Sequence, residues 1–434
     1  MLERHCVIGK TPLPMGCLCK PVRTCHNIRP PEFPLRAPDP PKLYAHPARL
    51  ILTLSLGAAV GLGICRFAYA LVLPDMRDTL HWSYSAAGFM NTINAAGYLA
   101  GALMASRLIE RFGWAAALKG GTLAALASLA MCAASGDFFL LSLARLIAGL
   151  GAAAAFVAGG ALAATVAQSQ PSRADFLLSL YYAVPGLGII ASGLIAPFVL
   201  HSFGPGSWWI VWWVLALVAA VMTIPLLLVR IESKPALSEP GGSGFSVAPV
   251  AIYLAGYFLF GAGYIGYMTF MIAYVRDAGG GASAQAVFWS LIGLSAFTTP
   301  WVWRSVLALN RGGVATAIIL SVNAIGAGLP ILGHSVLLLA VSALVFGVAF
   351  FAVVGSTTAF VRFNYPSSVW PAAIAAMTIS FGIGQTLGPI VVGAISDALG
   401  SITYALNVSA ALVALGAAAA AFQPKLTNTS APAE

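Results

Sequence analysis

The sequence predicts an all-α membrane protein with twelve transmembrane helices in two six-helix repeats and both termini in the cytoplasm. Three observations lead to this prediction. Hydrophobic residues make up 59% of the 434 residues and charged residues only 8%, whereas a soluble domain carries about 25% charge. Apolar runs long enough to cross roughly 30 Å of hydrocarbon recur along the chain. A single shift of 200 positions also lays glycines of one half on glycines of the other.

The repeat rests on two segments that lie far apart in the chain but need the same shift. The matched pairs are Gly61 with Gly261, Gly63 with Gly263, Gly188 with Gly388 and Gly193 with Gly393. A duplicated helical bundle explains these matches more simply than chance. Internal repeats in a polytopic membrane protein are typical of secondary transporters, whose halves rock around a site near the bilayer midplane.

Each apolar run is expected to be a helix, because an unpaired backbone cannot face lipid. Six runs precede a polar link and six follow it. The predicted spans are 50–73, 85–105, 114–134, 138–167, 176–200, 208–229, 247–275, 284–302, 313–332, 336–361, 369–395 and 402–422.

Basic residues set the predicted orientation, since Lys and Arg concentrate in cytoplasmic loops. Of the 22 Lys and Arg residues, eight lie in residues 1–49, and only Arg77 and Arg276 fall in loops on the opposite side. The net charge of +9 therefore reflects insertion and anionic lipid rather than nucleic-acid binding. We expect a multi-pass protein of the plasma membrane, of the bacterial inner-membrane type. The predicted parts are a disordered cytoplasmic tail (1–49), a six-helix bundle (50–229), a cytoplasmic linker (230–246), a second six-helix bundle (247–422) and a cytoplasmic C-terminal tail (423–434).

The N-terminal tail contains thiols and an imidazole that could hold a soft metal. These residues are Cys6, Cys17, Cys19, Cys25 and His26. Their spacing matches no standard zinc site, and a disordered leader is the alternative reading. We therefore predict no metal site and no cofactor.

Two arginines lie inside predicted spans, where an ionisable residue is costly and marks a candidate functional site. Arg66 and Arg145 each lie about two helical turns, roughly 10 Å, below the predicted outer boundary. No Asp or Glu occupies the middle of a predicted span. One hypothesis is that the two arginines donate to an anionic, carboxylate-like solute. The alternative is that each reaches the interface or binds helix-end carbonyls and holds structure.

Polar and aromatic stripes suggest further solute-binding residues. Asn91, Asn94 and Tyr98 share one face of the second predicted span, and Gln385 is an uncharged polar group within the eleventh. Tyr257, Tyr264 and Tyr267 follow a helical period in the seventh span, which is the repeat partner of the first. They could line a wet cavity, or serve as interhelical hydrogen bonds and aromatic packing.

Proline and glycine interrupt the fifth and eleventh spans, which are also repeat partners. Pro185 precedes Gly186 and Gly188, and Pro389 follows Gly388. Small residues permit close contact and proline allows bending. These segments suit a moving interface between bundles, and static packing is the alternative.

Local motifs resemble the major facilitator superfamily. The loop after the second span, Ser106-Arg107-Leu108-Ile109-Glu110-Arg111-Phe112-Gly113, resembles that family's G-x-L-A-D-R-x-G gating motif, with Ser106 in place of its first glycine and Glu110 in place of its aspartate. Trp114 replaces the arginine that follows, which removes one charge from the network. Arg145-Leu146-Ile147-Ala148-Gly149-Leu150-Gly151 is similar to the R-x-x-x-G-x-G signature that is associated with proton coupling.

Two further segments resemble the bacterial YbfB/YjiJ-like branch of that superfamily. They are Gly61-Leu62-Gly63-Ile64-Cys65-Arg66-Phe67-Ala68-Tyr69 in the first span and Gly384-Gln385-Thr386-Leu387-Gly388-Pro389 with Asp397 in the eleventh. The resemblance covers residues 50–422. It implies a central cavity lined by the first, fourth, seventh and tenth spans, which adds Tyr69 to the candidate solute-binding residues. It also implies a gating role for Glu110, Arg111 and Gly113. Asp397 and Asp75, near the predicted outer mouth, are possible carriers of a coupling proton, and Pro185 and Pro389 belong to the interface that could move between the bundles.

We predict a secondary active transporter that moves a small organic solute, favoured to be anionic, by alternating access and proton coupling. No phosphate-binding loop is present. The expected partners are the solute, protons and lipid, and we expect a monomer that binds no nucleic acid. Proton-driven efflux of drugs or metabolites is the alternative. A membrane sensor or an intramembrane enzyme would be a different class, and the histidines, which lie in the tail and predicted outer loops, do not support the enzyme.

Overall fold

The computed structural model describes residues 46–231, 245–309, 311–366 and 369–426, and every regular element within these ranges is a helix. All of them lie in one compact unit of the chain. The cysteine-containing tail and most of the predicted linker fall outside the described residues.

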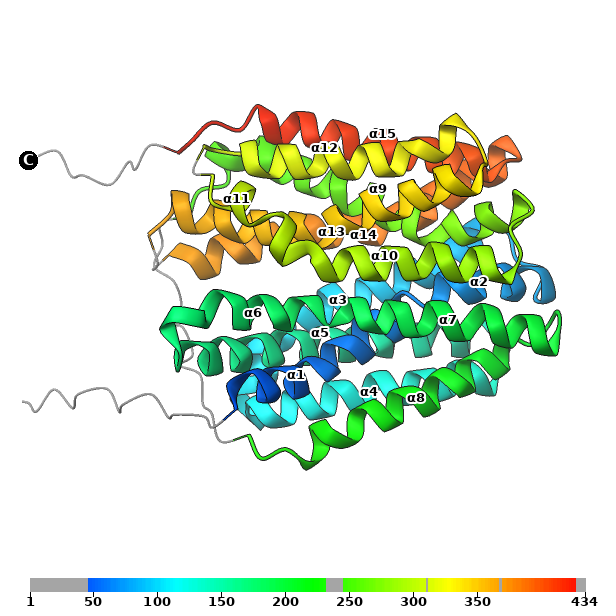
Figure 1. Ribbon diagram of the computed structural model, residues 1–434, viewed down its shortest axis with the longest axis horizontal. Helices are drawn as coiled ribbons and strands as arrows, with labels where there is room; N and C mark the ends of the chain where they lie inside the picture. The colour runs from blue at the N-terminus through cyan, green and yellow to red at the C-terminus, as the bar shows by residue number, and fades with distance from the viewer. Residues whose placement is uncertain (1–45, 232–244, 310, 367–368, 427–434) are drawn as a thin grey trace, which may run out of the picture. The chain divides into compact units, whose positions relative to one another are not determined.

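The first half contains the helices expected for six spans (Figure 1). Their bounds are α1 (Pro47–Ala58), η1 (Ala59–Arg66), α2 (Tyr69–Thr79), α3 (Tyr84–Phe112), α4 (Trp114–Ala134), α5 (Phe138–Gln168), η2 (Pro171–Arg173), α6 (Ala174–Ala183), α7 (Pro185–Phe203) and α8 (Trp208–Leu228). The first predicted span is thus three consecutive elements, and the fifth is divided where Pro185 begins α7.

The second half follows the same order. Its elements are η3 (Ala248–Val250), α9 (Ala251–Asp277), α10 (Ala282–Val302), α11 (Arg304–Leu307), α12 (Val314–Gly328), η4 (Leu329–Leu332), α13 (Val336–Asn364), α14 (Trp370–Leu399) and α15 (Ile402–Ala421). In Figure 1 the ends of the helices that the sequence predicts to face outside lie to the right, and we call these the predicted outer ends.

Local sequence explains where several helices begin and end. The side chains of Ser83, Asp137 and Ser335 accept N-cap hydrogen bonds at the starts of α3, α5 and α13. Gly113 ends α3 with φ 85°, a conformation that glycine adopts without a side-chain clash. The turns are therefore encoded beside the apolar runs that they separate.

Ten helices of the described part are long and apolar enough to cross a membrane. The predicted second and eighth spans, α3 and α10, are 29 and 21 residues long and lie outside those ten because polar residues lower their mean hydropathy. Along one side of α8, large apolar side chains are exposed, namely Trp209, Trp213, Leu217, Val221 and Leu228. Such a continuous apolar stripe suits contact with lipid rather than water.

The two halves meet along two helix pairs that the repeat exchanges. α3 packs along α14, and α10 packs along α7. Gly393 on α14 lies against Tyr84 of α3, and Gly193 on α7 lies against Trp289 of α10. These two matched glycines therefore lie at the two contacts between the halves, where the absence of a side chain lets the helices approach closely.

The first span breaks the repeat. Gly61 and Gly63 face α5 and α7, whereas their partners Gly261 and Gly263 face α14 and α15. Gly61 and Gly63 lie in η1, a π-helix of eight residues. A π-helix bonds i to i+5 and winds more loosely than an α-helix, so side chains in and after it point in other directions.

Replacing Gly188 with Ala should destabilise the protein, because its Cβ would lie 2.5 Å from the carbonyl oxygen of Ala59 and 2.9 Å from Cα of Gly63. These are backbone atoms, so we expect a loss of about 1–3 kcal/mol from overpacking. Thermal unfolding in detergent measures it. Gly120→Ala is the control, since a Cβ there meets nothing within 4 Å. Equal melting temperatures for the two variants would contradict the close contact.

Candidate functional site

Arg145 on α5 is buried, and all three nitrogens of its guanidinium are hydrogen-bonded. Nη1 donates to the carbonyl oxygen of Cys65 at 2.5 Å, and Nη2 donates to Oδ1 of Asn91 at 2.8 Å and to the carbonyl oxygen of Arg66 at 3.4 Å. Nε donates to the carbonyl oxygen of Met90 at 3.4 Å. Three of these four acceptors are backbone carbonyls, so Arg145 ties the end of η1 to α3.

The carbonyls that Arg145 binds lie where the π-helix ends. The N–H of Phe67 bonds five residues back, to Leu62, while that of Ala68 bonds four residues back, to Ile64. Helix ends and bonding transitions leave carbonyls that need other donors. This arrangement matches the alternative in which the arginine binds helix-end carbonyls and holds structure.

The polar residues along one face of α3 belong to the same hydrogen-bond network around Arg145. Asn94 donates to the carbonyl oxygen of Arg145 at 3.0 Å, and Nδ2 of Asn91 donates to Oγ1 of Thr269 on α9 at 2.7 Å. Tyr69 places its ring 4.8 Å from the Arg145 guanidinium, and its hydroxyl donates to a backbone carbonyl of α3 at 2.8 Å. In this conformation these side chains bind one another and the backbone.

Arg66, the last residue of η1, is 4% exposed and has a different environment. Its Nη2 donates to Oε1 of Gln385 at 2.5 Å and to the Tyr264 hydroxyl at 3.4 Å. The guanidinium carbon lies 5.1 Å and 5.9 Å from the ring centroids of Tyr98 and Phe67. Among the described residues, Nε and Nη1 have no hydrogen-bond acceptor, and no carboxylate forms an ion pair with Arg66.

The tyrosines of α9 divide into two groups. Tyr264 bonds Arg66, and Tyr257 stacks on Phe381 of α14 with ring centroids 5.0 Å apart. Tyr267 lies in a separate contact, where its hydroxyl hydrogen-bonds Oγ of Ser342 at 2.6 Å and its ring stacks on α13. The structure thus gathers Arg66, Gln385, Tyr264 and Tyr98 and gives Tyr267 other partners.

The gating motif lies at the predicted cytoplasmic end. Glu110 and Arg111 are exposed, and neither forms an ion pair with a described residue. Gly113 ends α3. Pro185 begins α7, and Pro389 lies inside α14 with its carbonyl against Gly88 of α3.

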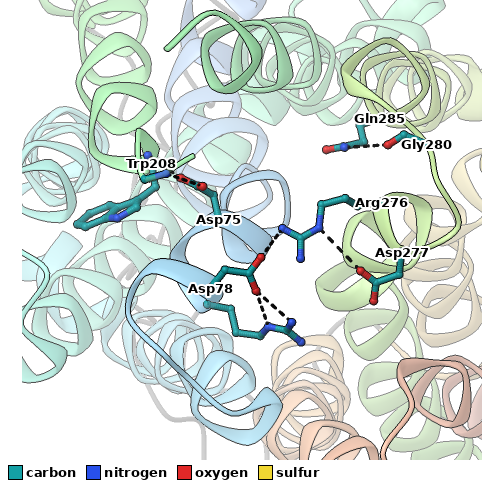
Figure 2. Close-up of polar contacts among 9 residues, drawn as sticks. Asp75, Asp78, Trp208, Arg276, Asp277, Gly280 and Gln285 are labelled. Atoms are coloured by element: carbon teal, nitrogen blue, oxygen red, sulfur yellow. Dashed lines mark hydrogen bonds and ion pairs between the residues drawn. The ribbon is translucent and has the colours of Figure 1, made fainter. Parts of the chain in front are cut away.

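Asp397 joins the two halves at the predicted outer end. Its carboxylate accepts from the backbone N–H groups of Tyr84 and Ser85, both at 2.8 Å, and from the Ser85 hydroxyl at 2.5 Å. These are free donors of the first turn of α3, which a carboxylate from α14 satisfies. Nearby, Arg276 pairs with Asp78 at 2.9 Å across the same junction (Figure 2).

A cavity of about 520 Å³ opens beside this ion pair, lined in part by Asp75, His201 and Arg276. Asp75 accepts from the backbone N–H groups of Gly206 and Trp208 at 2.8 and 2.9 Å, so it caps α8 (Figure 2). Its carboxylate is therefore occupied in holding the outer loop.

All polar contacts between the two halves, within the described ranges, lie in the middle of the helices or at the predicted outer end. The sequence did not indicate Thr269 as the partner of Asn91, or Phe381 as the aromatic partner of Tyr257. Only the contact of Asp397 with the start of α3 has a signal in the sequence. Ser83-Tyr84-Ser85 begins a predicted span, and the free N–H groups of its first turn need acceptors.

Comparison with known proteins places this site in context. The family described as "Uncharacterised MFS-type transporter YbfB" matches residues 58–421. A search of curated proteins gives no match. The nucleoside transporter NupG is similar in structure, with a TM-score of 0.63 and 15% identity over 85% of this chain and 98% of that one. A bacterial homologue of the human lysosomal transporter Spinster, in an inward-facing and unoccupied conformation, gives a TM-score of 0.65 and 14% identity over 87% and 96%. At these identities the likeness concerns the fold alone.

Arg145→Ala should destabilise the protein in the absence of any solute. It leaves the carbonyls of Cys65 and Arg66 buried without a donor, and each unsatisfied group costs about 1–3 kcal/mol. Thermal unfolding in detergent should show a lower melting temperature than for Arg362→Ala, which changes an exposed residue at the end of α13. A melting temperature equal to that of the control would show that Arg145 does not hold η1.

Proposed function

Because this chain belongs to the family of YbfB-like MFS-type transporters, we propose that it is a secondary active transporter that moves a small organic anion, carboxylate-like in chemistry, by alternating access. Membership of a transporter family agrees with the expectation that the chain is not an enzyme.

The observation that carries the proposal is the incomplete coordination of Arg66. A guanidinium has five N–H donors and no acceptor, and Arg66 uses only Nη2 among the described residues. A charge buried at membrane depth costs about 2.5–3.5 kcal/mol or more unless it is paired. A carboxylate offers both the negative charge and the acceptors that Nε and Nη1 lack.

The position of Arg66 suits a transported solute. It lies on the first half and bonds Tyr264 and Gln385 of the second. An anion bound here contacts both halves, so its binding free energy can depend on how the halves are arranged, which a coupled conformational change requires. Arg145, with its nitrogens bonded to η1 and α3, is assigned the supporting role of holding Arg66 in place.

The proposal includes closure at the predicted outer end. The contacts of Asp397 with α3 and of Arg276 with Asp78 join the halves there. The exposed ion pair contributes at most about 1 kcal/mol, so Asp397 is the stronger link. When the protein opens outward these bonds must break, and the exposed residues Glu110 and Arg111 are proposed to make the corresponding contacts at the other end.

Topology and location complete the proposal. Twelve crossings result if α3 and α10 span the membrane beside the ten more apolar segments. The proposed division into two six-helix bundles rests on the glycine repeat. The proposed cytoplasmic position of both termini rests on the distribution of basic residues, and the membrane is proposed to be the bacterial inner membrane.

Proton coupling is assigned to the solute rather than to a side chain. Asp75 and Asp397 both accept backbone N–H bonds in helix caps, so both carboxylates already have structural partners. A proton can instead enter on the carboxyl group of the solute. The rival, proton-driven efflux of cations, requires a carboxylate in the middle of a span, and the sequence places its acidic residues at the ends.

Arg66→Ala should abolish stabilisation by carboxylates. In a thermal-shift panel of acetate, lactate, succinate and benzoate, the unmodified protein should be stabilised by at least one anion. Loss of a charge-assisted hydrogen bond should weaken that binding about tenfold to a hundredfold. Arg362→Ala is the control and should keep it. Undiminished anion binding by Arg66→Ala would remove Arg66 from the site.

Asp397→Ala should loosen the predicted outer end in both halves. Hydrogen exchange followed by mass spectrometry should rise at the start of α3 and also at the end of α9. Asp137→Ala removes an N-cap within one half and is the matched control, expected to raise exchange at α5 alone. An increase confined to residues 84 and 85 in Asp397→Ala would mean that Asp397 is a local cap and does not hold the halves together.

A further inference from the structure

Aromatic rings gather beside Arg66 from three helices of the second half. Phe260 and Tyr264 of α9 stack with centroids 5.0 Å apart, and each lies 5.6 Å from the ring of Phe381 on α14. Phe350 on α13 lies 6.2 Å from Tyr264. The interplanar angles of these four pairs run from 14° to 25°, so the rings form one nearly parallel stack.

Tyr264 connects this stack to the Arg66 guanidinium. Tyr264 contributes its ring to the stack, and its hydroxyl accepts from Arg66 and donates to Gln385 at 3.2 Å. On the first half, Arg66 lies over the ring of Tyr98, and Phe67 packs edge-on against Phe350 at 6.0 Å. The Arg66 guanidinium therefore lies over ring faces of the first half, Tyr98 and Phe67, and reaches the stack of the second half through the Tyr264 hydroxyl.

Ordinary core packing is the simplest alternative for these rings, but it does not explain their polar members. Aliphatic side chains fill a membrane interior equally well, because lipid provides no hydrophobic drive between helices. Tyr98, whose ring centroid lies 5.1 Å from the guanidinium carbon of Arg66, brings a further hydroxyl to this place. Rings with parallel faces favour another flat ring, since offset stacking adds stabilisation beyond the area that is buried.

We propose that the transported anion is an aromatic carboxylate. Its carboxylate binds Nε and Nη1 of Arg66, and its ring stacks against Tyr264 and Phe381 on the second half and meets Tyr98 on the first. This inference rests on the proposed function, because it concerns the same site. It adds the class of solute, which the charge of Arg66 alone does not define.

Three matched probes separate the contribution of an aromatic ring to binding from that of a negative charge, in the purified full-length protein. Benzoate has both, cyclohexanecarboxylate has the charge and a saturated ring of similar size, and benzamide has the aromatic ring without the charge. Measured by calorimetric titration in detergent, benzoate should bind about tenfold more tightly than cyclohexanecarboxylate, the factor expected from aromatic stacking. Benzamide should bind more weakly than either carboxylate.

Substitutions test whether the preference for benzoate over cyclohexanecarboxylate depends on the aromatic stack beside Arg66. Phe381→Leu should reduce the benzoate preference to less than threefold and leave the affinity for cyclohexanecarboxylate unchanged. Phe360→Leu is the control, because Phe360 stacks on Tyr253 with centroids 4.2 Å apart, outside the stack beside Arg66, and it should keep the preference. Tyr264→Phe keeps the ring and should also retain it, which guards against a folding defect in the leucine variant.

Equal affinity for benzoate and cyclohexanecarboxylate, lost in both cases with Arg66→Ala, would overturn the aromatic inference and leave the proposed anion transporter in place. Failure of both carboxylates to bind would overturn the aromatic inference, and it would overturn the proposed function as well if acetate, lactate and succinate also fail. Binding that survives Arg66→Ala would overturn both. A benzoate preference that persists in Phe381→Leu and Tyr264→Leu would locate the ring elsewhere and also contradict the inference.

Discussion

Two buried guanidinium groups lie in the apolar interior of this protein, and both need hydrogen-bond acceptors. This need determines how the polar residues in the middle of the helices are arranged. Arg145 meets that need with the carbonyls at the end of a π-helix and with Asn91. Arg66 meets it only in part, through Gln385 and Tyr264. Nε and Nη1 of Arg66 have no acceptor among the described residues. In the function that we propose, Arg145 is therefore structural and Arg66 is available to a solute.

The π-helix links these two roles. Its looser winding rotates the end of the first span away from the geometry of its repeat partner, the seventh, and frees carbonyls for Arg145. Arg66 is the last residue of this segment, so its direction depends on how Arg145 holds the turn. Close glycine contacts at α3–α14 and α7–α10 place the halves against each other, while the polar links concentrate in the middle and at the predicted outer end. In the alternating access that we propose, one end opens while the packed helices rock.

The sequence was sufficient for the helices and for the position of Arg66, Arg145 and Gln385 inside them, where all three are buried, because each depends on the pattern of polarity along the chain. The sequence was insufficient to predict which groups these side chains contact. The acceptors of Arg145 are mainly backbone carbonyls, which every residue type has and which residue type therefore cannot predict. The π-helix that exposes them has no simple sequence period. Asp397, expected to take part in gating or coupling, caps α3 across 312 positions of sequence, a contact that only the packing of α14 against α3 creates. Tyr257, Tyr264 and Tyr267 share a helical period, yet small rotations give Tyr267 a separate partner in Ser342.

The position of a bound anion tests the role of Arg66 most directly. A crystal structure with 4-bromobenzoate, located by the anomalous scattering of bromine, would show whether the carboxylate lies within hydrogen-bonding distance of Nε or Nη1 of Arg66, with the ring beside Tyr264. We predict that position. Density confined to the outer cavity beside Arg276, with Arg66 unchanged, would contradict a solute site between the two halves.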